Sequence, residues 1–158
     1  TGTFFARRES NVIDWIRQSP LERWRTTNIR RVVVRGGELG VTRRTGDGVV
    51  RLDYTFLDAD AGEVTFLSKY VLDYARHKLA ASASLALPGR IALGQRLSYA
   101  RRADRRAYWL LDARLSRRIG PADAFIEGTN LLDEEYQEII GVDMPGRWIR
   151  AGVTLSSF

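Results

Sequence analysis

The sequence predicts an all-β protein, a portion of an antiparallel up-and-down transmembrane β-barrel with about eight strands. Apolar and polar residues alternate with a period of two along much of the 158 residues. The connections between these runs are alternately short and long, which is the outline of an outer-membrane barrel. No stretch approaches the roughly 18 to 20 consecutive apolar residues of a membrane helix, so any membrane crossing must use strands. Residues 1–158 are expected to form one domain.

The first four strands are expected at 3–16, 28–43, 48–58 and 76–87. The first is the least patterned, because Arg7 and Glu9 interrupt its apolar face. In the second, Gly36 indicates a bulge or a close approach of another segment. The fourth lies in an Ala- and Leu-rich stretch that would also suit a helix. We expect a strand there because Pro88-Gly89 then makes a tight turn.

The last four strands are expected at 91–101, 107–118, 122–131 and 147–157. They alternate most cleanly: in the final run, Ile149, Val153 and Leu155 share one face while Arg150 and Thr154 share the other. The predicted short turns, at the periplasmic end, are 44–47, 88–90 and 119–121. The predicted long loops, at the extracellular end, are 17–27, 59–75 and 132–146.

Alternation cannot decide which face lies outside, because a soluble barrel with an apolar interior gives the same pattern. The aromatic residues favour a membrane barrel, since two aromatic belts are typical of its interfaces. Aromatic rings that plug the ends of a soluble barrel are the alternative. The residues expected at the long-loop ends are Trp15, Tyr99, Tyr108, Trp109 and Trp148. Those expected at the short-turn end are Phe4, Phe5 and Phe158.

Six charged residues lie opposite apolar neighbours in these strands and would face the lumen of a membrane barrel. They are Arg51, Asp53, Asp112, Arg114, Glu127 and Arg150. We expect them to form a charge-paired network, because an unpaired charge in a narrow, partly dehydrated interior is costly.

The composition offers no basis for an enzyme, a metal centre or a cofactor site. There is no cysteine, the one histidine is His77, and no Gly-x-Ser-x-Gly motif occurs. The acidic run at residues 133–135 lacks the spacing of a calcium loop. The net charge of +6 comes almost wholly from arginines that are spread through the strands, so no nucleic-acid partner is expected.

The C-terminal residues carry the most specific motif, an Asn-Leu-hydrophobic-Asp…Tyr element followed by Pro-Gly-Arg, an alternating run and a final aromatic. Its residues are Asn130, Leu131, Asp133, Tyr136, Pro145, Gly146, Arg147 and Phe158. The arrangement resembles the C-terminal signature of TonB-dependent outer-membrane receptors, and residues 122–129 fit the penultimate strand of that family. The resemblance extends more loosely back to Phe4, which covers most of this chain but only the last third or so of such a receptor.

The resemblance implies a location in the outer membrane of a Gram-negative bacterium, in contact with lipid and lipopolysaccharide. The complete receptor would take up a small-molecule ligand, either a metal chelate (a siderophore) or cobalamin. It would engage TonB through an N-terminal part that this chain lacks, so we expect no active transport by this segment alone. Residues 4–16 look like the matching segment of vitamin B12 receptors, although siderophore receptors share much of it.

The resemblance also implies roles for single residues. Asp133 and Tyr136 would belong to a structural corner and would not contact the ligand. Gly36 and Glu38 match a Gly-x-Glu element of the family in which the Glu faces the lumen. Two other functions remain open: a small non-transporting structural outer-membrane barrel and a soluble eight-stranded ligand-binding barrel.

The edges of the predicted sheet need partners. Strands one and eight run antiparallel, so the chain could close on itself, and we favour this over edge-to-edge pairing with a second copy. A third possibility is that this chain is one part of a larger receptor, whose other strands would pair with the two edges. At the C-terminus, Ser156 and Ser157 shift Phe158 out of phase with the apolar face, so a bulge or a frayed end is expected near Ser156.

Overall fold

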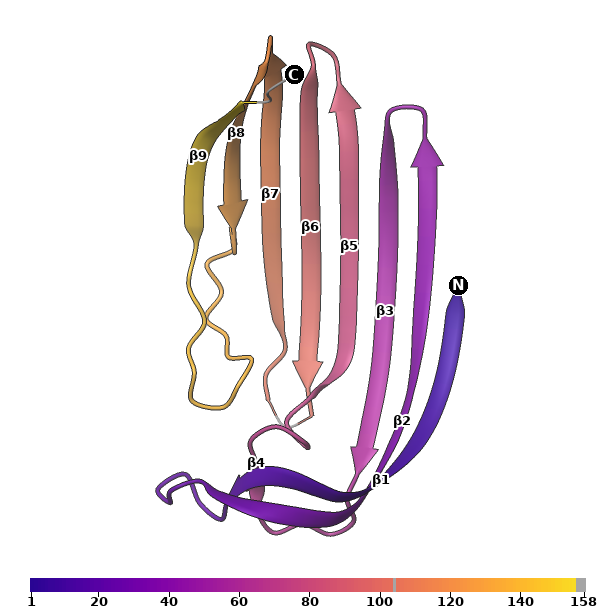
Figure 1. The fold of residues 1–158 in the computed structure, drawn as a ribbon, viewed down its shortest axis with the longest axis vertical. Helices are drawn as coiled ribbons and strands as arrows, with labels where there is room; N and C mark the ends of the chain where they lie inside the picture. Colours follow the sequence, from indigo (N-terminus) through magenta and orange to yellow (C-terminus); the bar gives the residue numbers. More distant parts are fainter. Residues whose placement is uncertain (104, 156–158) are drawn as a thin grey trace.

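The computed structural model describes residues 1–103 and 105–155, which form one antiparallel sheet of nine strands (Figure 1). The strands are β1 Gly2–Arg17, β2 Arg25–Thr45, β3 Gly48–Asp60, β4 Leu67–Ser68, β5 Ala75–Leu87, β6 Ile91–Arg102, β7 Tyr108–Ile119, β8 Ala122–Thr129 and β9 Trp148–Leu155. Their order across the sheet is β4-β1-β2-β3-β5-β6-β7-β8-β9. The all-β antiparallel class is confirmed, and each of the eight predicted strands is present; the ninth, β4, lies in the predicted loop 59–75.

Short turns join the strands at one end of the sheet and long loops join them at the other (Figure 1). The turn after β5 shows why this segment is a strand and not a helix. Leu87 pairs with Ile91 across the turn, and Gly89 (φ 82°) and Arg90 (φ 60°) supply the left-handed backbone of a tight reversal. Within the described residues, no helix is long and apolar enough to cross a membrane.

The ladder register collects the apolar residues of the strands on one side, which we call the apolar face. In one row across four strands, Tyr54 pairs with Leu79, Leu79 with Tyr99 and Tyr99 with Trp109. The opposite side, the polar face, carries charged and small residues. The large exposed side chains of the apolar face are Phe4, Leu39, Val41, Val50, Leu52, Tyr54, Phe56, Leu87, Leu97, Trp109, Leu115, Ile119, Ile126, Ile149, Val153 and Leu155.

Aromatic rings gather on the apolar face near the long-loop ends of the central strands. Tyr99 and Trp109 are in ring contact, with centroids 4.7 Å apart. On the neighbouring strands, the Phe56 ring lies 5.3 Å from the His77 ring, and the Tyr54 hydroxyl lies 2.8 Å from Nδ1 of His77. Amphipathic rings are therefore concentrated at one end of the strands, as the sequence predicted for Tyr99 and Trp109.

The predicted position of Phe4 and Phe5 at the short-turn end is wrong. Phe4 pairs with Gly37 and Phe5 with Gly36, and β2 continues well beyond these glycines before it reaches its turn. The two rings cover the backbone of glycines that have no side chain of their own. A Cβ atom on Gly36 would lie 2.5 Å from the Phe5 ring, so the close approach predicted at Gly36 is confirmed.

The hairpin of β1 and β2 bends and folds across the long-loop end of the sheet (Figure 1). Asn11 has a φ of 57°, which a residue with a side chain adopts only rarely, and the register omits it: Ser10 pairs with Arg31 and Val12 with Ile29. The bend brings apolar side chains of the hairpin onto the β3–β5 loop. They form a small core of Ile29, Val32 and Val34 with Phe5, Val12, Leu57, Ala59, Ala61, Phe66 and Val71.

Asp14 fixes the β3–β5 loop to this bent hairpin. The residue is only 1% exposed, and its carboxylate accepts hydrogen bonds from the Ser68 hydroxyl and from the backbone N–H groups of Trp15, Tyr70 and Val71. Ser68 belongs to β4, which pairs with the end of β1. A buried carboxylate is tolerated only with such a set of donors, so this cluster anchors the loop.

The change Asp14→Ala is expected to lower the free energy of unfolding by roughly 3 kcal/mol, because two loop amides and a hydroxyl lose a buried acceptor. Urea titration followed by tryptophan fluorescence measures the loss. The control is Asp47→Ala, which removes an exposed carboxylate at the opposite end of the sheet and should cost less than about 0.5 kcal/mol. Equal losses in the two variants would show that Asp14 is not an anchor.

The sheet is open, so the predicted closure of the first strand on the last is wrong. Among the described residues, β9 pairs only with β8, whereas β1 pairs with β2 and, at Ile16 and Arg17, with β4. The physical reason is that β4 covers the end of the outer edge of β1 and that this half of β1 bends across the end of the sheet (Figure 1). The position of Phe158 and the bulge expected near Ser156 lie outside the described residues.

Candidate ligand cavity at the long-loop rim

The charged residues predicted for the lumen all lie on the polar face of the sheet. They are Arg51 and Asp53 on β3, Asp112 and Arg114 on β7, Glu127 on β8 and Arg150 on β9. The largest cluster joins three strands: Glu127 accepts one hydrogen bond from Arg114 and one from Arg150, each at 2.7 Å. Cross-strand pairs of opposite charge stabilise a sheet and fix its register.

The other three of the six predicted residues, Arg51, Asp53 and Asp112, do not join the cluster around Glu127. Arg51 donates to both carboxylate oxygens of Asp53, at 2.6 and 2.7 Å. Asp112 instead accepts a hydrogen bond from the backbone N–H of Asn130, at 2.9 Å. These six residues thus form two separate ion clusters, and the remaining carboxylate, that of Asp112, holds the start of the loop after β8.

Asn130 organises this loop, which we call the corner loop (residues 130–147). It is buried and has a φ of 47°. Its side-chain amide donates to the carbonyls of Glu134 (3.0 Å) and Pro145 (3.3 Å), while its Oδ1 accepts from the Glu134 N–H (3.0 Å). The next residue, Leu131, packs against Gly128, where an added Cβ would lie 2.4 Å from the leucine side chain. One side chain therefore joins the two ends of the loop.

Asp133 and Arg147 close the base of the corner loop. The Asp133 carboxylate accepts hydrogen bonds from the backbone N–H of Arg147 at 2.9 Å and from its guanidinium at 3.2 Å. Asp133 has a φ of 56°, and a Cβ added to Gly146 would lie 3.1 Å from its carboxylate. The motif residues from Asn130 to Arg147 therefore come together around one loop.

Tyr136 holds the corner loop over the polar face by packing on Tyr108, with ring centroids 4.7 Å apart and planes at 35°. Tyr108 is buried in a small apolar cluster at the start of β7. Burial raises the pKa of the Tyr136 phenol above its usual value, and the nearby carboxylates of Glu138 and Asp112 raise it further. The ring therefore stays uncharged at neutral pH.

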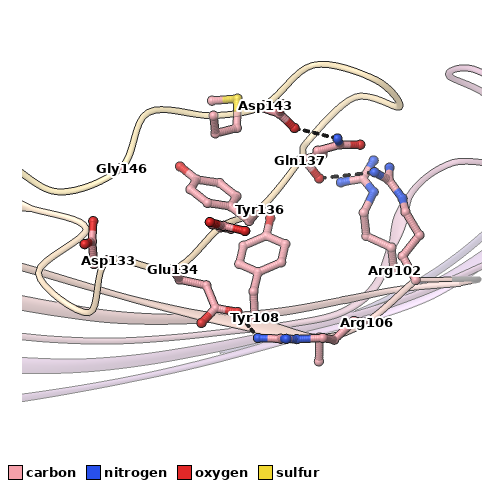
Figure 2. Close-up of a pocket in the computed structure, with 13 residues that line it drawn as sticks. Arg102, Arg106, Tyr108, Asp133, Glu134, Tyr136, Gln137, Asp143 and Gly146 are labelled. Atoms are coloured by element: carbon pink, nitrogen blue, oxygen red, sulfur yellow. Dashed lines mark hydrogen bonds and ion pairs between the residues drawn. The ribbon is translucent and has the colours of Figure 1, made fainter.

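The corner loop and the β6–β7 connection enclose an open cavity of about 1030 Å³ on the polar side of the sheet. Figure 2 shows Tyr108 and Tyr136 between the acidic side of the cavity, at Asp133 and Glu134, and the side that carries Arg102. Its charged lining residues are Arg102, Arg105, Arg106, Asp133, Glu134, Glu135 and Asp143. The walls of the cavity are therefore polar, apart from the pair of aromatic rings.

Asp73 ties the β3–β5 loop to the arginines of this cavity. Its buried carboxylate accepts a hydrogen bond from Nε of Arg102 at 3.0 Å and pairs with Arg105. Arg102 also donates to the Asp73 carbonyl at 2.5 Å, and Arg105 donates to the Gln137 carbonyl at 3.3 Å. One carboxylate therefore fixes two arginines, and Arg105 in turn links the β3–β5 loop, the β6–β7 connection and the corner loop.

Sequence reasoning did not identify Asp73, Arg102, Arg105 or Gln137. Arg102 ends β6 and the other three lie in separate connections, so the four are far apart in the sequence and no local spacing marks them. A second cavity, of about 420 Å³, lies beside the β3–β5 loop and shares Asp73 and Arg105 with this cluster. The only sequence signal was indirect, namely the long loops predicted to lie at the same end of the sheet.

No group of three or more His, Cys, Asp or Glu side chains is placed to hold a metal ion in the part of the chain that the structure describes. His77 lies on the apolar face beside Tyr54 and Phe56. Comparison with protein-family models gives no match, and neither does comparison with curated proteins. Function is therefore inferred from the two faces of the sheet, the corner loop and the cavity.

The change Asn130→Ala is expected to release the corner loop, because its side-chain hydrogen bonds are lost and alanine is strained at this positive φ. Limited proteolysis should then cut residues 134–146 at least about tenfold faster, since cleavage follows the population of the open loop. Asn130→Gly separates the loss of the hydrogen bonds from the backbone strain. Glycine adopts a positive φ without strain, but it has no side chain to form the hydrogen bonds. A glycine variant that is cut at the wild-type rate would show that the hydrogen bonds do not hold the loop.

Proposed function

We propose that this chain is the C-terminal barrel segment of a TonB-dependent outer-membrane receptor that takes up a metal chelate (a siderophore) or cobalamin. Its location would be the outer membrane of a Gram-negative bacterium. The observation that carries the proposal is the continuous apolar face, which runs from β1 to β9 opposite a polar face with ion clusters.

The extent of the apolar face suits contact with lipid and lipopolysaccharide. A soluble monomer rarely exposes a contiguous apolar patch larger than a few hundred Å². Here Phe4 on β1 is 92% exposed and Leu155 on β9 is 75% exposed, with exposed apolar residues on each of the strands between them. Outward apolar residues that alternate with a polar interior are the pattern of a transmembrane barrel.

The contacts within the corner loop support the proposed receptor family. The spaced residues of the motif meet around one loop: Asn130 binds both of its ends, Asp133 binds Arg147, and Tyr136 packs on Tyr108. A chance match to a spaced motif would give no reason for its members to contact one another. The motif is therefore a physical unit, as expected for a structural corner ahead of the last strand.

The open edges support a barrel that contains further strands. β1 and β9 present rows of backbone N–H and C=O groups along most of the two edges, and lipid does not tolerate such groups unpaired. In the proposed receptor, further strands pair with both edges and the polar face lines the lumen. TonB would be engaged through the N-terminal part of the receptor, so this segment would not carry out active transport alone.

The two alternatives fit the geometry less well. A small structural barrel made of this chain alone would need a ladder between β1 and β9, and the described strands do not form one. A soluble ligand-binding barrel would place the apolar face inside. The corner loop and its cavity, which lie on the polar side, would then be on the outside of the barrel.

The proposal is tested first by solubility and then by one pair of variants. The chain should stay monodisperse only in detergent or lipid; a stable monomer in plain buffer contradicts the proposal. In lipid, Leu52→Arg places a charge on the apolar face and should lower the unfolding free energy by about 2–4 kcal/mol. Thr55→Arg lies on the polar face of the same strand, opposite Glu38, and should cost less than about 1 kcal/mol. A larger loss for Thr55→Arg would reverse the assignment of the faces.

A further inference from the structure

We infer that Arg43 and Arg117 hold the phosphate groups of anionic phospholipids at the short-turn end of the sheet. The inference rests on the proposed function, which puts the apolar face in lipid, and it names the lipid class that this face selects. Three observations carry it: both arginines lie on the apolar face, their ladder partners on that face are uncharged, and neither guanidinium has a carboxylate partner among the described residues.

Arg43 lies at the end of the apolar row of β2. Val41 and Arg43 share one side of the strand, and Arg43 pairs with Val50 of β3, which belongs to the apolar face. The strand stops at Thr45, so Arg43 lies close to the β2–β3 turn. A long arginine side chain covers apolar surface with its stem while its charged head reaches the polar region. This position therefore suits the boundary between acyl chains and headgroups.

Arg117 interrupts the apolar row of β7 close to the β7–β8 turn. Leu115 and Ile119 precede and follow it on the same side of the strand. Its ladder partners are Ile91 of β6 and Ala124 of β8, so no carboxylate lies beside it on this face. In the proposed receptor, a cation in this position near the membrane surface is stabilised by an anion that the membrane supplies.

The short-turn end as a whole carries positive charge that the chain does not neutralise (Figure 1). The carboxylates at this end are Asp47, in the β2–β3 turn, and Asp123, on the polar face, and neither forms an ion pair within the described residues. The same holds for the guanidinium groups at this end, which are those of Arg43, Arg44, Arg90, Arg117 and Arg118. Such an excess of cations attracts anionic lipid.

A phospholipid matches both parts of this surface. The planar guanidinium offers parallel N–H donors that fit two oxygens of a phosphate. The acyl chains would lie on the adjoining apolar rows, over Val50 beside Arg43 and over Leu115 beside Arg117. A zwitterionic headgroup brings its own cation, which the surrounding arginines repel, so a headgroup of net negative charge is favoured.

Each of the two arginines has a matched control next to it in the sequence. Arg44 and Arg118 are also exposed and without an ion pair among the described residues, but they lie on the polar face, because side chains alternate along a strand. The double variants Arg43→Gln/Arg117→Gln and Arg44→Gln/Arg118→Gln therefore remove the same charge from the same end of the sheet. They differ only in the face that loses it.

The test is electron paramagnetic resonance of spin-labelled phosphatidylglycerol and phosphatidylcholine around the whole chain, folded in phosphatidylcholine bilayers. The ratio of the two association constants measures the selection of the anionic lipid. We expect Arg43→Gln/Arg117→Gln to lower this ratio at least about threefold and Arg44→Gln/Arg118→Gln to lower it less than about 1.5-fold. Arg43→Lys/Arg117→Lys keeps the charge but loses the planar fork, and it should lower the ratio about twofold.

Equal losses in the two glutamine variants, or no preference for phosphatidylglycerol in the wild type, would overturn the inference and leave the proposed function standing. Displacement of the spin-labelled lipid by inorganic phosphate at matched ionic strength would also overturn it, because the site would then take the free ion. A larger loss in the Arg44→Gln/Arg118→Gln variant would reverse the two faces and contradict both the inference and the proposed function. A stable monomer in plain buffer refutes the proposed function itself.

Discussion

The register of the antiparallel ladder is the constraint on which the rest of this structure depends. Side chains alternate along a strand, so a slip of one residue would exchange the two faces of a strand. Between β8 and β9, Glu127 pairs with Arg150 on the polar face. Three residues further along the same ladder, Ala124 pairs with Val153 on the apolar face. The cluster of Arg114, Glu127 and Arg150, which joins three strands, therefore also keeps an apolar row in place, and a slip would put Arg150 among the apolar side chains.

At the long-loop end, buried carboxylates take the role that an apolar core has in other proteins. Asp14 gathers backbone amides of the β3–β5 loop, and Asp73 in the same loop holds Arg102 and Arg105. The apolar cluster around Val32 is small, so these polar contacts fix loops that would otherwise depend on few packed residues. The position of the cavity arginines is thereby linked to the bent hairpin through one loop.

The strands could be predicted from the sequence because period-two alternation is a local property, and the motif from Asn130 to Arg147 was visible because its members are close in the sequence. The offset between strands is not local. Phe4 was misplaced because nothing in the sequence shows that β2 runs well past Gly37 before it turns. The bend at Asn11 and the pairing of Asp73 with Arg105 were missed for the same reason, since each depends on which loops the register brings together.

The polar face and the cavity differ in how far they depend on the open edges of the sheet. In the proposed receptor, the polar face becomes a lumen only when other strands complete the barrel; in the open sheet, the exposed pair of Arg51 and Asp53 lies in a high-dielectric environment where it contributes little. The cavity does not depend on that completion, because the corner loop, the β6–β7 connection and Asp73 all belong to this chain. Hydrogen bonds of Asn130 and the packing of Tyr136 on Tyr108 hold its walls whether or not the edges are paired. The walls of the cavity are therefore held by contacts within this chain, independently of whether the two edges of the sheet are paired.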